Sequence, residues 1–336
     1  MSKADCNRGK TNPRNPAQNG GSGSISGKDG YHCETVSDDF HVATPRRTSR
    51  KFLLELEPTL SDLDWKILKI IRRCRVILGR QIGRLYFDGY KTTHASTVAT
   101  NRKLKALTDL GLIQAVNQKI DCRMRGYVAY IYYLTEAGER ILQIHLGEPE
   151  TRKRNIEPST VTLAHTVSVS ECYVQAVETC RRDDLKLTEI QLEPECWRPY
   201  QRNYKQCILK PDLAFVTEKQ DWSSHDEPWY EMRWFVEMDL NTENIQTILT
   251  KCRRYYDYYK SDMEQKLHDD VFPLVVWIVK TESRRNSLIR HICGNFPQYP
   301  RIFAVILPDE FTALVRDELD LEGYLCPDTN RKEPRL

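Results

Sequence analysis

The chain has 336 residues, of which 40% are hydrophobic and 29% charged, and its formal net charge is +3. This is long enough for two domains and a tail, and no run approaches the roughly 20 apolar residues that a membrane-spanning helix needs. The first residues lack the apolar core of a secretory signal, so we expect a cytoplasmic protein without membrane contact. The 11 cysteines are scattered without a Cys-x-x-Cys pair, which argues against a zinc site and for reduced thiols.

Composition divides the chain into a polar start and two folded parts. Residues 1–55 are rich in glycine and serine and end in a basic cluster, so we expect a disordered tail. Further expected parts are a first domain at 56–146, a linker with glycine, proline and charges at 147–160, a second domain at 161–322 and a C-terminal tail at 323–336. We therefore expect a two-domain α+β protein.

Three amphipathic helices are expected at the start of the first domain, and a fourth closes it from Thr135 to about His145. Ser61 caps the first, apolar residues at helical spacing mark the second at 77–87, and the third runs from about His94 to Leu110. Thr92 or Thr93 caps the third helix. Gly111 ends it, because glycine is favoured just past a helix C-terminus.

The third helix has two unlike faces. One face is predicted to lie in the core and carries Thr100, Leu104, Leu107 and Leu110. The other face carries hydroxyl, amide and cationic groups, which suit base edges and phosphates in a DNA major groove. Its candidate DNA-binding residues are Thr97, Asn101, Arg102 and Lys105.

Two strands follow, at 112–116 and 127–134. The hairpin between them carries Lys119, Arg123 and Arg125, where cations can hold phosphates without reading sequence. Helices followed by a basic hairpin are typical of a winged helix-turn-helix that binds double-stranded DNA. The alternative is a small α/β domain with a solvated basic face.

Positive charge is concentrated in this first domain. Residues 61–145 contain 15 lysines and arginines against 7 acids, a net charge of +8, so the rest of the +3 chain carries −5. A localised basic segment supplies the attraction to phosphates that a nucleic-acid-binding module needs. This distribution favours DNA binding over the alternative.

The second domain alternates between helices and strands. Helices are expected at about 163–182, 243–261 and 284–293, with a last one after Pro308. Strands are expected at 186–192, 206–217, 229–240, 272–280 and 301–307. This order implies a mixed sheet flanked by helices.

Acidic residues fall on two of these strands. Asp212 lies in one strand, and Glu237 and Asp239 are two apart on the next, so the side chains of the latter two share a face. Glu171 on the preceding helix is a fourth candidate. Converging carboxylates hold Mg²⁺ in hydrolytic nucleases, so these four are the candidate metal ligands.

This pattern resembles the PD-(D/E)xK nuclease superfamily. The resemblance implies an α/β nuclease-like fold, with Asp212 and Glu237 as the two metal-binding acids. Asp239 stands where the family usually has a lysine that orients or activates the attacking water. Lys251 on the next helix is the candidate to replace that lysine. Mg²⁺ is the only cofactor expected, and only if the site is active.

The acids also have a structural explanation. Glu237 and Asp239 can be the remnant of a site without metal, or Asp239 can belong to the start of the following helix, with Thr242 as its cap. We expect His165 to make a local hydrogen bond rather than act as a base. The tyrosines between 255 and 259 are expected mainly in the core.

A series of short motifs lies between Leu60 and Leu307. They are Asn101–Leu104, Leu110–Ile113, Tyr132–Gly138, His165–Glu171, Lys210–Asp212 and Glu237–Asp239, with Thr242, Lys251 and Tyr255. Their order resembles the replication-relaxation family of plasmid and conjugative-element proteins. The resemblance implies a DNA-binding accessory protein that positions a relaxase or replication initiator at an origin, without implying that the chain itself cuts DNA.

We therefore expect an accessory protein of plasmid or mobile-element replication, relaxation or mobilisation. Its expected partners are double-stranded DNA, a relaxase or initiator, and a second copy of the chain. One alternative is a metal-dependent endonuclease that uses Asp212, Glu237 and Asp239. A weaker alternative is a transcriptional repressor.

Overall fold

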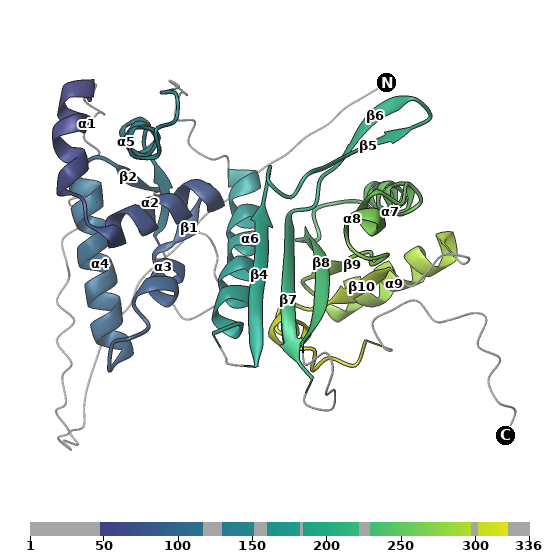
Figure 1. Ribbon diagram of the computed structural model, residues 1–336. Coiled ribbons are helices and arrows are strands. Elements are labelled where there is room, and N and C mark those ends of the chain that lie inside the picture. The colour runs from purple at the N-terminus through teal and green to yellow at the C-terminus, as the bar shows by residue number, and fades with distance from the viewer. Residues whose placement is uncertain are drawn as a thin grey trace, which may run out of the picture. The chain divides into compact units, whose positions relative to one another are not determined.

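The computed structural model describes residues 48–116, 130–150, 160–181, 184–221, 229–296 and 302–321. The protein is α+β, with one three-stranded and one five-stranded sheet and a separate two-stranded ribbon (Figure 1). Residues 47–336 form one compact unit. The expected division at 147–160 falls mainly on residues outside the described ranges and stays a prediction.

The N-terminal half is mainly helical. Its helices are α1 (Arg50–Leu56), the 3-10 helix η1 (Glu57–Thr59), α2 (Asp62–Cys74), α3 (Gly79–Tyr86), α4 (Thr93–Asp109) and α5 (Glu136–Leu146). Its strands are β1 (Ile77–Leu78), β2 (Ile113–Val116) and β3 (Ile131–Leu134). They form an antiparallel sheet in the order β1-β3-β2.

The predicted helix ends of this half are confirmed. Ser61 and Asp64 form a reciprocal cap at the start of α2, in which the Asp64 carboxylate accepts from the Ser61 amide at 2.9 Å. The Thr92 side chain caps α4 and accepts from the Ala95 amide at 3.1 Å. Gly111 has φ +71°, the left-handed conformation that glycine adopts without strain.

Three details differ from the prediction. Helix α1 begins at Arg50, inside the stretch predicted as a tail, because Ser49 caps it and Leu53 is buried in the core. Residues 77–78 form a strand rather than the start of a helix, since they pair with β3. Leu110 follows the last turn of α4 and is exposed, although the helical wheel places it in the core.

The C-terminal half is built on the five-stranded sheet. Its helices are α6 (Thr160–Thr179), α7 (Ile245–Tyr259), α8 (Met263–Leu267), α9 (Glu282–Asn295) and α10 (Phe311–Val315). Its strands are β4 (Leu185–Leu192), β5 (Arg198–Arg202), β6 (Lys205–Leu209), β7 (Leu213–Gln220), β8 (Trp229–Asp239), β9 (Leu274–Val279) and β10 (Phe303–Ile306).

The sheet is mixed, as predicted, with the strand order β10-β9-β8-β7-β4. Strands β8, β9 and β10 are parallel to one another, and β7 and β4 are antiparallel to their neighbours. Strand β9 is buried on both faces, because α6 and α10 cover one face of the sheet while α7 and α9 cover the other. This placement brings three helices to the acidic residues of β7 and β8.

The prediction of one strand at 206–217 is wrong. Two strands, β6 and β7, replace it, and Lys210-Pro211-Asp212 separates them. Pro211 has no amide hydrogen to donate to a neighbouring strand, and the Asp212 amide donates to the Val236 oxygen at 3.1 Å as β7 begins. Strand β6 instead pairs with β5, which the sequence reasoning missed, in the two-stranded ribbon.

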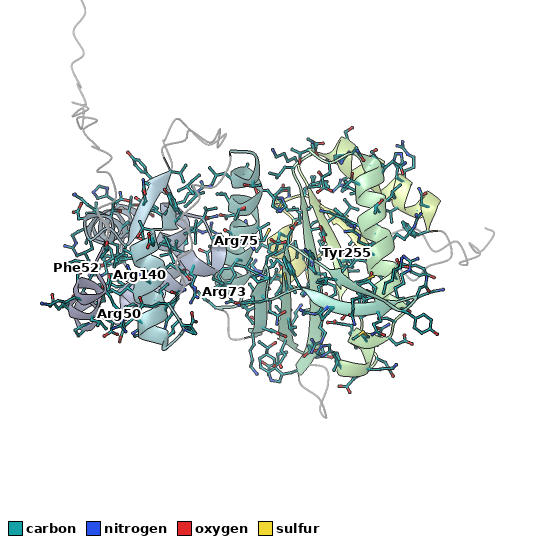
Figure 2. The ribbon with its side chains drawn as sticks, turned by 90° about the horizontal axis from the view of Figure 1, so that it is seen from above. Arg50, Phe52, Arg73, Arg75, Arg140 and Tyr255 are labelled. Carbon is teal, nitrogen blue, oxygen red and sulfur yellow. The ribbon has the colours of Figure 1, made fainter. Side chains whose placement is uncertain are left out.

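The two halves share a hydrophobic core and a set of ion pairs. Arg84 on α3 pairs with Glu171 and Glu178 on α6, with Nε lying 2.9 and 3.0 Å from the two oxygens of Glu178. Figure 2 shows Arg73 and Arg75 between the N-terminal helices and the C-terminal sheet, where they pair with glutamates of the segment after β4. The contacts of Arg84 attach α3 to α6, and those of Arg73 and Arg75 attach the end of α2 to the segment after β4.

Three cysteines, Cys74, Cys172 and Cys252, are buried in helices and form no disulfide, in line with the expectation of reduced thiols, and burial raises the pKa of Cys74 to about 12. Among the described residues no helix combines the length and apolar character required to cross a bilayer.

Gly138 lies where the first turn of α5 packs on the segment after α4. A Cβ atom at this position would lie 2.0 Å from the Leu112 carbonyl oxygen. That oxygen already accepts from the Thr135 amide at 3.1 Å, so it has little freedom to move. Glycine is therefore required here by a close approach of two backbone segments.

We predict that Gly138→Ala lowers the free energy of unfolding by about 1–3 kcal/mol, because the added methyl group overlaps a backbone oxygen. Gly294→Ala is the matched control, since its Cβ would meet nothing within 4 Å on α9. We expect the control to gain about 0.5–1 kcal/mol from helix propensity. Urea unfolding measures both, and equal stabilities of the two variants would contradict the packing argument.

Candidate functional site

Helix α4 presents one polar face to solvent. Thr97, Asn101, Arg102 and Lys105 are all exposed, and Val98 between them is 52% exposed. The opposite face is buried through Thr100, Leu104 and Leu107, which hold the helix against α3 and β2. The two faces predicted from the helical wheel are thus confirmed except at Leu110.

Some of the polar side chains on this face already form hydrogen bonds or ion pairs within α4, and others do not. The Thr97 hydroxyl donates to the Thr93 oxygen at 2.8 Å, and Lys105 Nζ lies 3.0 Å from both Asp109 oxygens. That ion pair is exposed on both sides and is therefore weak. Asn101 and Arg102 have no side-chain partner in the described part of the chain.

The predicted basic hairpin lies outside the described residues. Lys119, Arg123 and Arg125 fall between residues 117 and 129, where only the flanking strands β2 and β3 are described. These two strands pair antiparallel from Ile113–Leu134 to Val116–Ile131. The three cations stay predicted DNA contacts.

Asp212 is at the start of β7 and is almost buried. Its Oδ2 accepts from the Met238 amide at 2.8 Å, and its Oδ1 lies 3.1 Å from His165 Nε2 on α6. The hydrogen bond to Asp212 raises the pKa of His165, although burial opposes it. This contact favours the charged imidazolium beside the Asp212 carboxylate, and it joins α6 to the sheet.

Glu237 on β8 is buried beside Asp212. Its Oε1 accepts from the Tyr255 hydroxyl at 2.7 Å, and its Oε2 lies 3.1 Å from Lys251 Nζ, both on α7. Burial and the nearby charge of Asp212 raise the pKa of Glu237, whereas Lys251 and Tyr255 lower it by less. Burial lowers the pKa of Lys251, but Glu237 and Glu243 raise it by more. The lysine is held as a cation between two carboxylates.

Asp239 has different partners from the other acids. Its Oδ2 accepts from Arg284 Nε on α9 at 2.7 Å, and its Oδ1 accepts from the Asn241 amide at 2.9 Å. The expectation that Thr242 caps the following helix is wrong, because Asn244 does so through its side chain. Asp239 serves to bind α9 to the end of β8.

Glu171 is also directed away from the other three acids. It pairs with Arg84 and accepts from Gln81 Nε2 at 2.7 Å, both on α3. In the described part of the chain, no three His, Cys, Asp or Glu side chains are arranged to hold a metal ion. Arg284 is bound to Asp239 and Arg84 is bound to Glu171, so two of the four predicted ligands, Asp212 and Glu237, lie side by side while the other two point to arginines.

The cluster that forms consists of Asp212, Glu237 and Lys251, which were predicted, with His165 and Tyr255. Sequence reasoning assigned His165 to a local contact and Tyr255 to the core, and only the family motifs singled out both. A hollow of about 320 Å³ lies beside Lys251. It is lined by Asn244, Gln246, Thr247, Thr250, Lys251 and Arg254.

We predict that part of the stability of the fold depends on protonated His165. Because its folded pKa is raised, the contribution is complete below its ordinary value of 6.5 and is lost as pH rises through the folded value. His165→Gln should reduce the slope of unfolding free energy against pH in this window, as measured by urea titrations. The control His291→Gln removes a histidine whose ring lies 2.7 Å from the Ser287 oxygen of its own helix, α9. Unchanged slopes for His165→Gln would contradict the charged pair.

Comparison with known proteins places this arrangement in a family. A family model described as Replication-relaxation matches residues 68–275, which is more than half of the chain. No curated protein and no solved structure matches the chain significantly. The matched stretch includes the polar face of α4 and the cluster of Asp212, Glu237 and Lys251. The chain therefore belongs to the replication-relaxation family.

Proposed function

We propose that the chain is a DNA-binding accessory protein in the replication or relaxation of a plasmid or other mobile element. Membership of the replication-relaxation family supports a role in the replication or relaxation of such an element. The exposed polar face of α4 is the single observation that carries DNA binding. In this role the protein positions a relaxase or replication initiator at an origin.

The N-terminal half supports a winged helix-turn-helix. Helices α2, α3 and α4 precede the antiparallel pair β2–β3, and α4 turns its polar face outward. Asn101 and Arg102 are free to make bidentate contacts to adenine and guanine, and Lys105 can exchange Asp109 for a phosphate. Helix α4 is then the recognition helix, and duplex DNA is the ligand.

The C-terminal half has the features of a nuclease-like platform. An aspartate after a proline, a glutamate on the next strand and a lysine on the next helix come together at one end of a mixed sheet. Their side chains are already engaged with one another and with α6 and α7. We propose that this half supports α4 and binds a partner protein, which can include a second copy of the chain.

We predict that Arg102→Ala weakens binding to a duplex from the protein's own origin by about 1–3 kcal/mol, because a base contact is lost. Fluorescence anisotropy at several salt concentrations measures this. Arg290→Ala is the matched control, since Arg290 is an equally exposed arginine on α9. Equal losses in both variants would show that binding follows net charge alone, and α4 would not be the recognition helix.

A metal-dependent endonuclease is the second candidate, favoured by the approach of Lys251 to Glu237. We predict that supercoiled plasmid stays intact when incubated with the protein and Mg²⁺ or Mn²⁺, because Asp239 and Glu171 are bound to arginines and Lys251 is held between Glu237 and Glu243. Agarose gels with and without EDTA measure nicking. Metal-dependent nicking that disappears in Asp212→Asn, with unfolding stability retained, would establish the endonuclease instead.

A further inference from the structure

The β5–β6 ribbon extends beyond the five-stranded sheet (Figure 1). Its strands pair from Arg198–Leu209 to Arg202–Lys205, and Asn203-Tyr204 forms a two-residue turn. Both turn residues have positive φ, +48° and +60°, as a type I′ turn requires. Glycine is favoured at the second position, and a tyrosine there is held in a conformation that bulky side chains rarely adopt.

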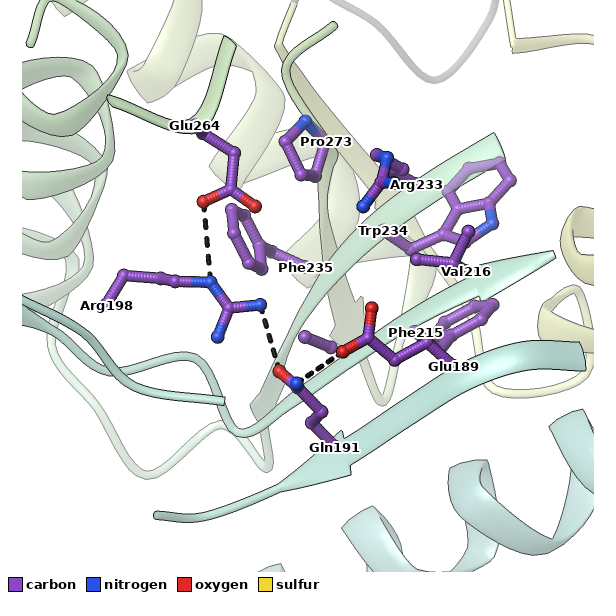
Figure 3. Close-up of a pocket in the computed structure, with 11 residues that line it drawn as sticks. Glu189, Gln191, Arg198, Phe215, Val216, Arg233, Trp234, Phe235, Glu264 and Pro273 are labelled. Atoms are coloured by element: carbon purple, nitrogen blue, oxygen red, sulfur yellow. Dashed lines mark hydrogen bonds and ion pairs between the residues drawn. The ribbon is translucent and has the colours of Figure 1, made fainter. Parts of the chain in front are cut away.

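The base of the ribbon is fixed to the C-terminal half. Tyr200 is buried and packs edge-on against Tyr258 of α7, with ring centroids 5.4 Å apart. Arg198 Nε lies 3.4 Å from Glu264, and the same guanidinium donates to Gln191 at 2.9 Å (Figure 3). The hollow that these side chains line is only about 10 Å³, so it accepts no ligand. The ribbon is therefore a firmly held projection.

The tip of the ribbon presents an aromatic ring among cations. Tyr204 is fully exposed, Lys205 beside it is exposed without an ion pair in the described part of the chain, and Ile208 is 48% exposed. Arg202 pairs with Asp257 at 2.5 Å, yet its side chain remains 51% exposed. Residues 198–210 include four cations and no acid.

We infer that the tip of this ribbon, Arg202–Lys205, is a second contact with duplex DNA. A two-stranded antiparallel ribbon fits a DNA groove, and an exposed ring at its end can lie against base edges or enter a base step. Lys205 and Arg202 would then hold the flanking phosphates. Lys205 has no ion pair within the described residues and the Arg202 side chain stays half exposed, so the tip favours a polyanion over a protein surface. The inference rests on the proposed function, since it adds a contact to a DNA-binding protein.

The base of the ribbon lies next in sequence to the cluster of Asp212, Glu237 and Lys251. Strand β6 ends at Leu209, and Asp212 follows within three residues. DNA held at the ribbon would therefore run close to the end of the sheet where Asp212, Glu237 and Lys251 meet. This gives the C-terminal half a role in positioning DNA that does not require cleavage.

The test compares Tyr204→Gly and Lys205→Ala with Arg102→Ala in the full chain, by anisotropy with an origin duplex. Tyr204→Gly suits the turn, so we expect its thermal stability to equal or exceed that of the wild type, while affinity falls about 5–20-fold. Lys205→Ala should lower the salt slope by about one. Lys186→Ala, which removes an exposed lysine near the opposite end of the sheet, where Lys186 of β4 pairs in register with Glu218 of β7, should leave both quantities unchanged.

The outcomes separate the two proposals. If Arg102→Ala weakens binding and both ribbon variants bind like the wild type, the ribbon inference is wrong and the function of α4 stands. If only the ribbon variants weaken binding, the ribbon is the DNA contact and α4 is not. If the wild type does not bind DNA, both are wrong. A photoreactive phenylalanine analogue at position 204 should crosslink to DNA, and crosslinking only to a second chain would overturn the inference.

Discussion

Three carboxyl groups are buried at one end of β7 and β8, and their need for hydrogen-bond donors fixes the helices around the sheet. An unpaired buried carboxylate costs several kcal/mol, so each of Asp212, Glu237 and Asp239 needs a donor from a covering helix. The partners are His165 on α6, Lys251 and Tyr255 on α7, and Arg284 on α9. A set of acids that resembles a metal site thus also determines how helices on both faces of the sheet are attached.

Ion pairs between partly exposed side chains extend this attachment from the sheet to the N-terminal half. Glu171 and Glu178 project from α6 toward α3, and both pair with Arg84. Because α3 is bound to α6 in this way, α4, which follows α3 and packs against it, is also held in place. A rigidly held α4 can present its polar face without further ordering, which lowers the entropic cost of binding.

Local features of the sequence were sufficient to predict most elements but few of the contacts. The helix ends at Ser61, Thr92 and Gly111 could be predicted, because a helix cap depends on residues that are close together in the sequence. The partners of the acids could not be predicted, since Asp212 meets His165 across 47 residues and Asp239 meets Arg284 across 45. Periodicity likewise identified α4 but could not show that Lys210-Pro211-Asp212 divides two strands, because both flanking segments are equally suited to a strand.

The neutralised cluster also makes a DNA-binding role for the C-terminal half physically consistent. Free carboxylates next to the β5–β6 ribbon would repel phosphates and oppose its cations. Pairing with His165, Lys251 and Arg284 removes most of this repulsion while keeping the carboxylates in the core. In this view Lys251 cancels charge, whereas the lysine of a nuclease would orient the attacking water. Asp239 stands at the position where such nucleases usually have that lysine, and here it binds Arg284 of α9. If the ribbon binds DNA as proposed, the acidic end of the sheet beside it is one whose charge no longer opposes that contact.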